Sequence, residues 1–541
     1  MLSLGLATLT CSAAEPYFIP GSFVTGFTPD NTKAVSEYFG ALVIYDLESG
    51  EFRAFEPNED GTREYYAGVG NYLANNAICA SQGTYTGASA FLWGKTGINN
   101  GRFVEISNDA IGGIGAANGV TADGTRFCGN TPTGIEFGIE AEGTMVVPCT
   151  WDRNGNTFTR TLLPAPTTDY AGLAPQYVTA LSISDNGKTI IGQIVSNNGF
   201  LHEFVIYTQA EDGTWSYRRP FDSLVNPNKL TYPEYPGDEG PDYVTAENYM
   251  TEEEFAQYIA ATEEYYAKFP NGNNPPAAVD YMTEEEKAAY LAALAVFKEW
   301  SDKYDAWVAV DEQIRQESID FEMNLNSLSP NGRYMASSTV VTKFVGLERV
   351  SEHQPFLYDI VEDKVLVNGG PNIRVTSVND NGDVLGFVRD MVLGDLGYVL
   401  LAGTTEWIPL EQYVVQRNPS LVQWVEDNWK HEVEVIIDYE EMITDFQTLY
   451  ITGTPFISRD WSMLSTVFFP TWENTNPDIM SDWYNSCIMD LSEQTSINEV
   501  ETLGNANAPV EYFNIQGIRV NEPQNGIFIR RQGSNVSKVR K

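Results

Sequence analysis

The sequence contains few of the residues that most often catalyse reactions or bind metals. Its 541 residues include 3 histidines, His202, His353 and His431, and none of them belongs to an HExxH motif. The GxSxG, Walker and dinucleotide-binding motifs are absent as well. The 74 acidic residues could still supply a carboxylate pair for glycoside hydrolysis, because such a pair needs no fixed spacing in the sequence. The catalytic residues therefore remain unknown, and we expect no metal site and no cofactor.

Basic residues are also scarce. Lys and Arg number 32 against 74 Asp and Glu, which gives a formal net charge of -42 and a pI near 4.2. Binding to a phosphate backbone relies on Lys and Arg, so this balance argues against nucleic acids and anionic membranes as partners. No stretch after the first residues reaches the roughly 18 apolar residues of a membrane-spanning helix. The acidity favours an exported protein that its charge keeps in solution.

The cysteines do not indicate a disulfide framework or a metal site. Besides Cys11 the chain has Cys79, Cys128, Cys149 and Cys487, all within predicted strands and at spacings that do not fit a zinc site. Cys128 and Cys149 fall on the second and third strands of one predicted sheet. Two interpretations stay open for them, a cross-strand disulfide and small buried hydrophobic residues.

A short pattern recurs through most of the sequence. It consists of an apolar residue, then Ser, Thr or Asn, a turn such as Asp-Asn-Gly, and an alternating apolar run that ends in a small residue. Asn, Asp and Gly tolerate the positive φ of a tight turn, so the pattern predicts a β-hairpin. Clear copies begin at Gly119, Leu181, Ser327 and Ser377, and weaker copies at Phe27, Leu73 and Ile457.

A further apolar strand follows each hairpin, which gives seven similar units, most of them about 45 to 60 residues apart. Self-similarity at this period, with roughly four strands per unit, indicates a β-propeller. We therefore predict an all-β fold with seven blades over residues 15–491. Six or eight blades are alternatives to this count, and an ordinary β-sandwich is the competing architecture.

The repeat units resemble extracellular HAF-type repeats and, more loosely, TolB-type propeller repeats, over about residues 23–491. The residues that carry the resemblance are Ile183, Ser184, Asp185, Asn186, Gly187 and Gly192 in the turn, and Trp93 and Trp151 at strand ends. The resemblance implies a secreted β-propeller. It implies no particular activity, because propellers host many unrelated functions.

The ends of this region suggest how the ring of blades closes. The seventh unit has no clear fourth strand after its last apolar run, whereas the residues from Pro16 to Ile19 are strand-like and precede the first unit. A propeller with an unpaired last blade would expose a strand edge. We therefore predict that the N-terminal residues supply the missing strand.

The period changes between the fourth and fifth units, at about residues 221–320. Two near copies, YMTEEEFAQYIAA from Tyr249 and YMTEEEKAAYLAA from Tyr281, each begin with a capping box of Thr and Glu. Apolar residues at helical spacing follow, so about residues 245–318 are predicted to be helical. The Glu triplets are interpreted as solvated helix-start residues. The aromatic residues Tyr265, Tyr266, Trp300 and Trp307 are predicted to pack between helices and propeller, with sugar stacking as the alternative.

The N-terminal segment, residues 1–14, is apolar and ends in a small-x-small pattern at Ser12 and Ala14. It is typical of the hydrophobic region and cleavage site of a secretory signal peptide that lacks its basic start. A lipid anchor on Cys11 is the alternative.

The C-terminal segment, residues 510–541, follows a polar linker at residues 492–509. The run from Tyr512 to Gly517, then Pro523, the run from Gly526 to Ile529, and Lys538-Val539 resemble a type IX C-terminal sorting domain. That resemblance implies a small β-unit that directs the chain to outer-membrane export machinery. The expected location is secreted or on the outer cell surface, with the periplasm as an alternative.

Together these features favour a binding protein for a glycan or an extracellular protein. The alternative is a propeller-type glycoside hydrolase or polysaccharide lyase that acts on an extracellular polymer. The long segments between strands all fall opposite the hairpin turns, so we predict a binding face on that side. Its candidate ligand-binding residues are His353 and the aromatic residues Trp424, Trp429, Trp472, Trp483 and Tyr484.

Overall fold

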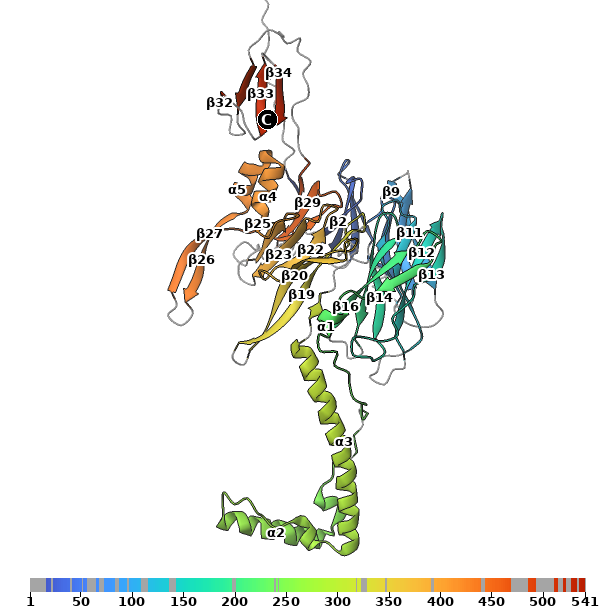
Figure 1. Cartoon of the computed structure of the whole chain (residues 1–541), viewed down its shortest axis with the longest axis vertical. Helices are drawn as coiled ribbons and strands as arrows, with labels where there is room; N and C mark the ends of the chain where they lie inside the picture. The colour runs from blue at the N-terminus through green and yellow to red at the C-terminus, as the bar shows by residue number, and fades with distance from the viewer. Residues whose placement is uncertain are drawn as a thin grey trace, which may run out of the picture. The chain divides into compact units, whose positions relative to one another are not determined.

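Figure 1 shows the computed structural model of the chain. By its internal contacts the chain divides into a body, Ala14–Ser492, and a C-terminal unit that begins at Glu493. The structure describes residues 16–20, 23–38, 41–50, 52–55, 65–67, 73–82, 87–94, 97–108, 115–135, 143–196, 201–237, 240–241, 243–317, 319–322, 328–345, 348–390, 394–438, 443–468, 485–492, 510–513, 519–521, 527–532 and 535–540.

The body consists of consecutive antiparallel sheets whose neighbouring strands follow one another in sequence. A single parallel bridge from Val146 to Tyr177 joins the third and fourth sets of strands into one sheet. The strands of the N-terminal half are β2 (Phe23–Phe27), β3 (Lys33–Tyr38), β4 (Ala41–Asp46) and β5 (Phe52–Phe55); β6 (Tyr65–Ala67), β7 (Ala77–Gln82), β8 (Gly87–Gly94) and β9 (Gly97–Asn108); β10 (Ala116–Val120), β11 (Arg126–Pro132), β12 (Val146–Asn154) and β13 (Thr157–Leu162); and β14 (Tyr177–Ile183), β15 (Thr189–Val195), β16 (His202–Gln209) and β17 (Trp215–Arg218).

The same topology continues after the helical insertion. The strands are β18 (Asp320–Phe321), β19 (Tyr334–Val345), β20 (Glu348–Asp359) and β21 (Lys364–Asn368); β22 (Arg374–Val378), β23 (Val384–Asp390), β24 (Gly394–Leu400) and β25 (Trp407–Pro409); and β28 (Thr454–Ile457), β29 (Met463–Phe468) and β30 (Asn485–Asp490). The N-terminal strand β1 (Tyr17–Pro20) runs antiparallel to β30, with Ile19 opposite Ser486. β1 therefore pairs with the strand that the sequence left without an outer partner. Successive four-stranded antiparallel sheets of this kind are the architecture of a β-propeller.

The hydrophobic core lies between consecutive sheets. Phe127 and Trp151 of the third set pack against Ala77 of the second, for example, and Leu464 and Met489 of the last set pack with the sheet before it. Another cluster joins the last set to the first, since Ile19 and Ile488 pack with Val24, Phe27 and Ala34. Apolar side chains of neighbouring sets pack together in the remaining clusters in the same way.

Helices occur in two insertions. Between β17 and β18 lie α1 (Asp222–Val225), η1 (Ala246–Tyr249), α2 (Glu252–Lys268), η2 (Ala278–Tyr281) and α3 (Glu284–Glu317), so the predicted helical region is confirmed. Between β25 and β28 lie α4 (Leu410–Arg417), η3 (Pro419–Leu421), α5 (Val422–Asn428) and a hairpin of β26 (Lys430–Asp438) and β27 (Ile443–Tyr450). The sequence analysis identified this second insertion but not its secondary structure.

The C-terminal unit contains a small antiparallel sheet. Its strands are β31 (Val510–Phe513), β32 (Arg519–Val520), β33 (Ile527–Gln532) and β34 (Asn535–Arg540), in the order β32-β31-β33-β34. Glu511 and Arg519 form an ion pair at 3.1 Å within it. A short β-unit at the end of the chain is what the sequence predicted there.

Candidate binding surface

The repeated turns are held by hydrogen bonds from a few side chains. The Ser184 hydroxyl donates to Asn186 Oδ1 at 2.7 Å, and the Lys188 amide donates to the same oxygen at 2.9 Å. Gly187 follows Asn186 with φ of +69°, a value that glycine adopts without strain. The same hydroxyl-to-Asx bond recurs in the turns that begin at Thr28, Thr121, Ser329 and Ser458. The repeated sequence pattern is therefore a turn that five of the sets of strands build in the same way.

Three of these turns use Asp in place of Asn. Burial disfavours the charged carboxyl of Asp460, but hydrogen bonds from the Ser458 hydroxyl and the Ser462 amide outweigh it and lower its pKa. The pKa values of Asp30 and Asp123 are lowered by the same balance of effects. These carboxylates stay ionised at neutral pH, so each turn keeps an acceptor for its own amides.

The turns also bond to one another along the chain. The Asp30 amide donates to Asn75 Oδ1 at 2.9 Å, and the Asp185 amide donates to the Pro330 carbonyl at 2.7 Å. Asn31, in the first turn, donates to Asp460 in the last turn at 3.1 Å. Further links join Asn75 to Ala122, Arg126 to Gly187, and Asn331 to Asp380. Turns that are far apart in the sequence therefore meet on one side of the body.

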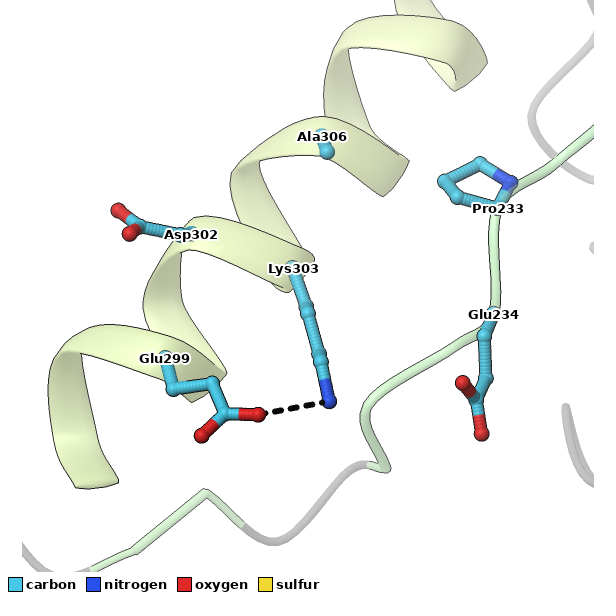
Figure 2. Close-up of a pocket in the computed structure, with 6 residues that line it drawn as sticks. All are labelled: Pro233, Glu234, Glu299, Asp302, Lys303 and Ala306. Atoms are coloured by element: carbon cyan, nitrogen blue, oxygen red, sulfur yellow. Dashed lines mark ion pairs between the residues drawn. The ribbon is translucent and has the colours of Figure 1, made fainter.

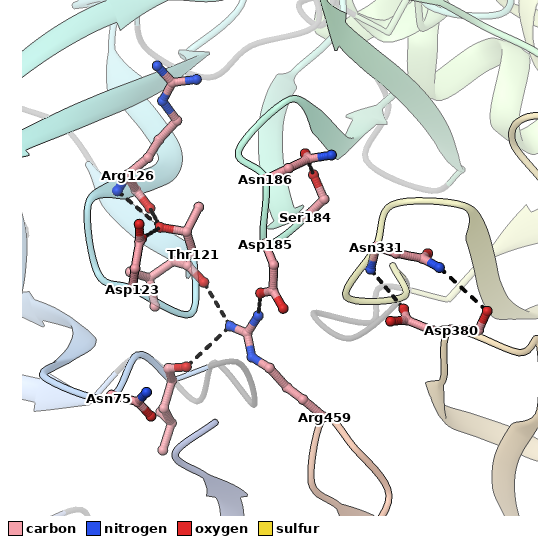
Figure 3. Close-up of polar contacts among 12 residues, drawn as sticks. Asn75, Thr121, Asp123, Arg126, Ser184, Asp185, Asn186, Asn331, Asp380 and Arg459 are labelled. Atoms are coloured by element: carbon pink, nitrogen blue, oxygen red, sulfur yellow. Dashed lines mark hydrogen bonds and ion pairs between the residues drawn. The ribbon is translucent and has the colours of Figure 1, made fainter. Parts of the chain in front are cut away.

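Arg459 extends from the last turn across this side (Figure 3). Its guanidinium donates to the carbonyl of Leu73 at 3.2 Å and to that of Val120 at 2.9 Å, and it forms an ion pair with Asp185. The residue is only 9% exposed. One side chain thus connects four turns that belong to four different sheets. On the turn side the surface near Arg459 is therefore occupied by the protein's own contacts.

The helical insertion is attached on that opposite side. At the start of β17, Trp215 pairs with Gln209, which lies next to the repeated turn at Ser184. β17 then runs away from that turn. β18, in which Asp320 pairs with Val340, begins the following sheet at the far end from its turn. The register therefore agrees with the sequence-based expectation of short turns on one side and long insertions on the other.

The base of α3 is fixed firmly to the sheets. The Tyr232 hydroxyl donates to Asp311 Oδ1 at 2.6 Å, and the Tyr232 ring stacks on Trp307 with centroids 5.0 Å apart. Burial raises the pKa of Tyr232, and the neighbouring Asp311 adds to the effect, so the hydroxyl keeps the proton that it donates. Ile314, which is fully buried, packs with Phe321 of β18. The packing role predicted for Trp307 is confirmed.

Beyond this base, residues 243–306 form what we call the helical arm. The two sequence copies meet in it reciprocally: the Tyr249 ring lies 5.6 Å from Tyr290, and Tyr281 lies 5.9 Å from Tyr258. Tyr249 and Tyr281 hold the same place in the two copies, as do Tyr258 and Tyr290. Both predicted Thr-Glu capping interactions form, at Thr251 and at the equivalent position of the second copy. The arm is therefore a pair of related units with a local pseudo-twofold arrangement.

The arm buries little of its apolar surface. α2 contains no buried side chain. Ile259 is 38% exposed and Leu291, its equivalent in the second copy, is 47% exposed. Tyr265 and Tyr266 pack on each other, at a centroid distance of 5.4 Å, and not on the propeller as the sequence suggested. Among the described helices and strands, α2 makes most of its contacts with η1 and η2, so these two tyrosines belong to the arm.

A groove runs between α3 and the segment that leads into the arm. It consists of two adjoining hollows of about 340 Å³ and 310 Å³ that share Glu234, Glu299 and Lys303. Figure 2 shows the residues that line the first of them. Its other lining residues are Pro233, Tyr235, Pro236, Pro241, Val296, Trp300, Asp302 and Ala306. Gly240 lies against the Trp300 ring, so closely that a Cβ atom added to this glycine would come within 2.9 Å of the indole. The groove thus combines carboxylates with proline and aromatic surface.

Of the predicted ligand-binding aromatic residues, two lie in the described part of the chain. Trp429 is 0% exposed and packs edge-on to Trp424, with centroids 5.8 Å apart, in a core that also contains Tyr413 and Trp461. Trp429 therefore anchors α4 and α5 to the sheets and offers no surface to a ligand. Trp424 is partly buried, and its ligand role stays a prediction. Trp472, Trp483 and Tyr484 lie outside the described residues.

His353, the remaining candidate, lies on β20 beside a carboxylate. Its Nδ1 is 3.2 Å from Glu322 Oε2, and Arg374 lies 2.8 Å from the other oxygen of Glu322. Burial disfavours the charged Glu322 carboxyl, but the contacts with His353 and Arg374 outweigh it and lower its pKa. His202 forms a similar pair with Asp320 at 2.9 Å. The two pairs connect Asp320 of β18, and Glu322 just after it, to neighbouring strands. The ligand role of His353 stays a prediction.

Other expected features can be compared with the described residues only. Cys79, Cys128, Cys149 and Cys487 are buried free thiols, which favours the hydrophobic interpretation over a disulfide. Burial raises the pKa of Cys79 to about 12. Among the residues that the structure describes, no group of His, Cys, Asp and Glu is arranged to hold a metal ion, and no helix is long and apolar enough to cross a membrane.

Comparison with known proteins finds distant structural likenesses. No family model and no curated protein sequence matches the chain. The β-propeller domain of Cps50 (Swd1) from Myceliophteria thermophila is 9% identical, with 88% of this chain and 99% of that one covered and a TM-score of 0.33. The WD40 domain of SCAP from fission yeast is 9% identical, with 97% and 94% covered and a TM-score of 0.33. A putative TolB from Agrobacterium tumefaciens is 10% identical, with 67% and 86% covered and a TM-score of 0.29. TM-scores this low transfer no function, and the propeller assignment rests on the strand pairing itself.

Proposed function

We propose that the chain is an exported binding protein in which a seven-bladed propeller carries a helical arm that recognises a protein partner. The observation that carries this proposal is the contrast between the two ends of the insertion. The base of α3 is buried and bonded to the sheets through Asp311 and Ile314, whereas α2 has no buried side chain. A helix gains most of its stability from packing of its apolar face, so an arm that packs so little is suited to being completed by a partner.

The seven-bladed ring is part of the proposal. It is supported by the four-stranded sets of the body when β1 is counted with β28, β29 and β30. The hydrogen bonds from Asn31 to Asp460 and the cluster around Ile19 and Phe27 bring the last set against the first. A closed ring would give the arm a rigid platform, because each sheet is then held by two neighbours.

A protein fits the arm better than a glycan as the partner. Exposed apolar residues surrounded by charged ones are typical of protein interfaces. On the arm these apolar residues are Tyr243, Ile259, Tyr266, Phe269, Leu291 and Val296. Acidic residues surround them, in the first turns of α2 and α3 above all. The partner's contact surface would therefore combine apolar and basic side chains.

The test compares the full chain with a variant in which a Gly-Ser linker replaces residues 234–303. Pro233 and Ala306 line the same hollow, so the linker spans a short gap, and Tyr232, Trp307 and Asp311 keep the base intact. Retention is measured on arrays of purified extracellular proteins and of polysaccharides. We expect protein binding to fall at least tenfold in this variant, and to persist in a control variant that lacks the tip of the β26–β27 hairpin.

Two outcomes would contradict the proposal. One is unchanged protein binding by the variant that lacks residues 234–303. The other is retention by a polysaccharide together with its cleavage, which would favour the hydrolase or lyase alternative.

We further propose that the C-terminal unit directs export. The support is its sequence resemblance together with the compact antiparallel sheet at residues 510–540. A chain that lacks residues 510–541 is expected to keep the thermal unfolding of its body but to fail to reach the cell surface, as measured by fractionation and surface labelling. Normal surface delivery of the shortened chain would overturn the sorting role.

A further inference from the structure

We propose that the groove beside α3 binds an arginine side chain of the partner, held between Glu234 and Glu299 of α3. This inference rests on the proposed function, because it specifies the chemistry by which the arm recognises a protein.

The charge of the groove selects a cation. Two carboxylates border it, that of Glu234 on one wall and that of Glu299 on α3. Asp302 also lines the groove, but its carboxylate points away from Glu234 (Figure 2). The one cation among the lining residues, Lys303, lies 3.2 Å from Glu299 and reaches it from the next turn of the helix (Figure 2). Asp302 is paired at 2.8 Å with Lys298, outside the groove. Among the described residues, Glu234 forms neither a hydrogen bond nor an ion pair, so it has an unused charge.

The walls of the groove select a planar cation with an apolar stem. Trp300 and Tyr304 stack at 5.2 Å with an angle of 16° between their rings, and Trp300, Tyr235 and Pro236 all line the groove. A guanidinium group can lie on an aromatic face and still present two N–H groups to a carboxylate, whereas an ammonium group is a hydrated point charge. The methylene groups of the same side chain would cover Val296, which is 59% exposed.

The size of the groove agrees with this occupant. Each hollow, at about 310 to 340 Å³, lies at the lower end of the range for ligand sites and can take one long side chain with part of its backbone. A second arginine could follow in the adjoining hollow, because the two hollows share Glu234 and Glu299. The partner segment would then be an extended basic stretch.

The experiment uses the full chain and a defined probe. A fluorescein-labelled peptide with two Arg-Pro pairs is titrated by anisotropy in 150 mM salt, next to the same peptide with citrulline, which is uncharged and almost the same shape, in place of arginine. We expect the citrulline peptide to bind at least tenfold more weakly. Glu234→Gln should weaken the arginine peptide about five- to tenfold. Glu253→Gln, which removes the same charge from an exposed site on α2, should change the affinity less than twofold.

A gain of affinity gives the sharpest test. Lys303→Met removes the groove's own cation and frees Glu299, so the arginine peptide should bind about threefold more tightly. Lys268→Met removes the same charge from α2, where Lys268 is paired with Glu264, and should have little effect. A variant that only damages the fold would not increase affinity.

Three results would overturn the groove assignment: no binding of the arginine peptide, equal binding of the citrulline peptide, or equal effects of Glu234→Gln and Glu253→Gln. The last of these would mean that the peptide responds to net charge alone. If the groove variants behave normally while removal of residues 234–303 abolishes retention on the protein array, the arm's function stands and the arginine site is wrong.

Discussion

Removal of residues 16–20 is expected to destabilise the body by about 3 to 5 kcal/mol. Ile19 is 4% exposed and packs with Val24, Phe27 and Ile488, and burial of such a side chain contributes about 1.5 to 3 kcal/mol. The deletion also removes the backbone hydrogen bonds between β1 and β30, each of which makes a net contribution of about 1 kcal/mol to stability. The measurement is chemical and thermal unfolding, with an expected fall of several degrees in melting temperature.

Two companion variants separate the causes. Replacement of residues 16–20 by a Gly-Ser segment of equal length keeps the chain length but should lose the same stability. Ile19→Ala alone should lose about 2 to 4 kcal/mol, since the strand remains but its buried side chain is cut back. The deletion should also uncover the edge of β30 and promote self-association, visible by size-exclusion chromatography. Unfolding that matches the intact chain would contradict closure through β1.

Replacement of Arg459 by Met is expected to destabilise the body by about 3 kcal/mol. The substitution leaves the carbonyls of Leu73 and Val120 without their donor and removes the ion-pair partner of Asp185. Loss of one partner of a largely buried charge pair typically costs about 3 to 5 kcal/mol, and the lower value applies because the Asp185 side chain is 38% exposed. The stability of Arg459→Lys should lie between that of the unsubstituted protein and that of Arg459→Met, because one ammonium group cannot reach acceptors on three separate turns.

A double-mutant cycle identifies the ion pair's share of this effect. Asp185→Asn keeps an acceptor oxygen but removes the charge, so it should cost less than Arg459→Met. If the two changes together cost less than their sum, the difference is the coupling between Arg459 and Asp185. Full additivity, or unchanged unfolding in Arg459→Met, would show that this side chain does not hold the turns together.

Local patterns predicted most of the fold. The Ser-x-Asn-Gly turn at Ser184 is specified within a few residues, so its hairpin could be predicted without tertiary information. The capping boxes at Thr251 and Thr283 are local in the same way. The pairing of β1 is a long-range contact, yet it was predictable because one sheet lacked a strand and the N-terminal residues had no other sheet to join.

The candidate site was harder to predict. Arg459 looks in the sequence like any arginine after a turn, since its partners Asp185 and Leu73 are hundreds of residues away. The groove depends on how an irregular, proline-rich segment lies along α3, and no periodicity reports that packing. Trp429 was predicted as a ligand residue because aromatic residues in long insertions often bind, but the sequence could not reveal that α4 and α5 fold over it.

The pairing of the first strand with the last sheet sets the order in which the body can fold. β1 is synthesised first, whereas its partner β30 lies near the end of the body. A second contact is equally distant in sequence, because the Val24 amide donates at 2.8 Å to the hydroxyl of Ser486, 462 residues further on. Contacts at such separation are costly to form early, and they slow folding. β1 must therefore wait without its partner strand, and the first sheet without the side chains of the last one against it, until nearly all of the body has left the ribosome. The body thus completes its folding only after its synthesis, and a chain interrupted before residue 485 would lack the partner of its own first strand.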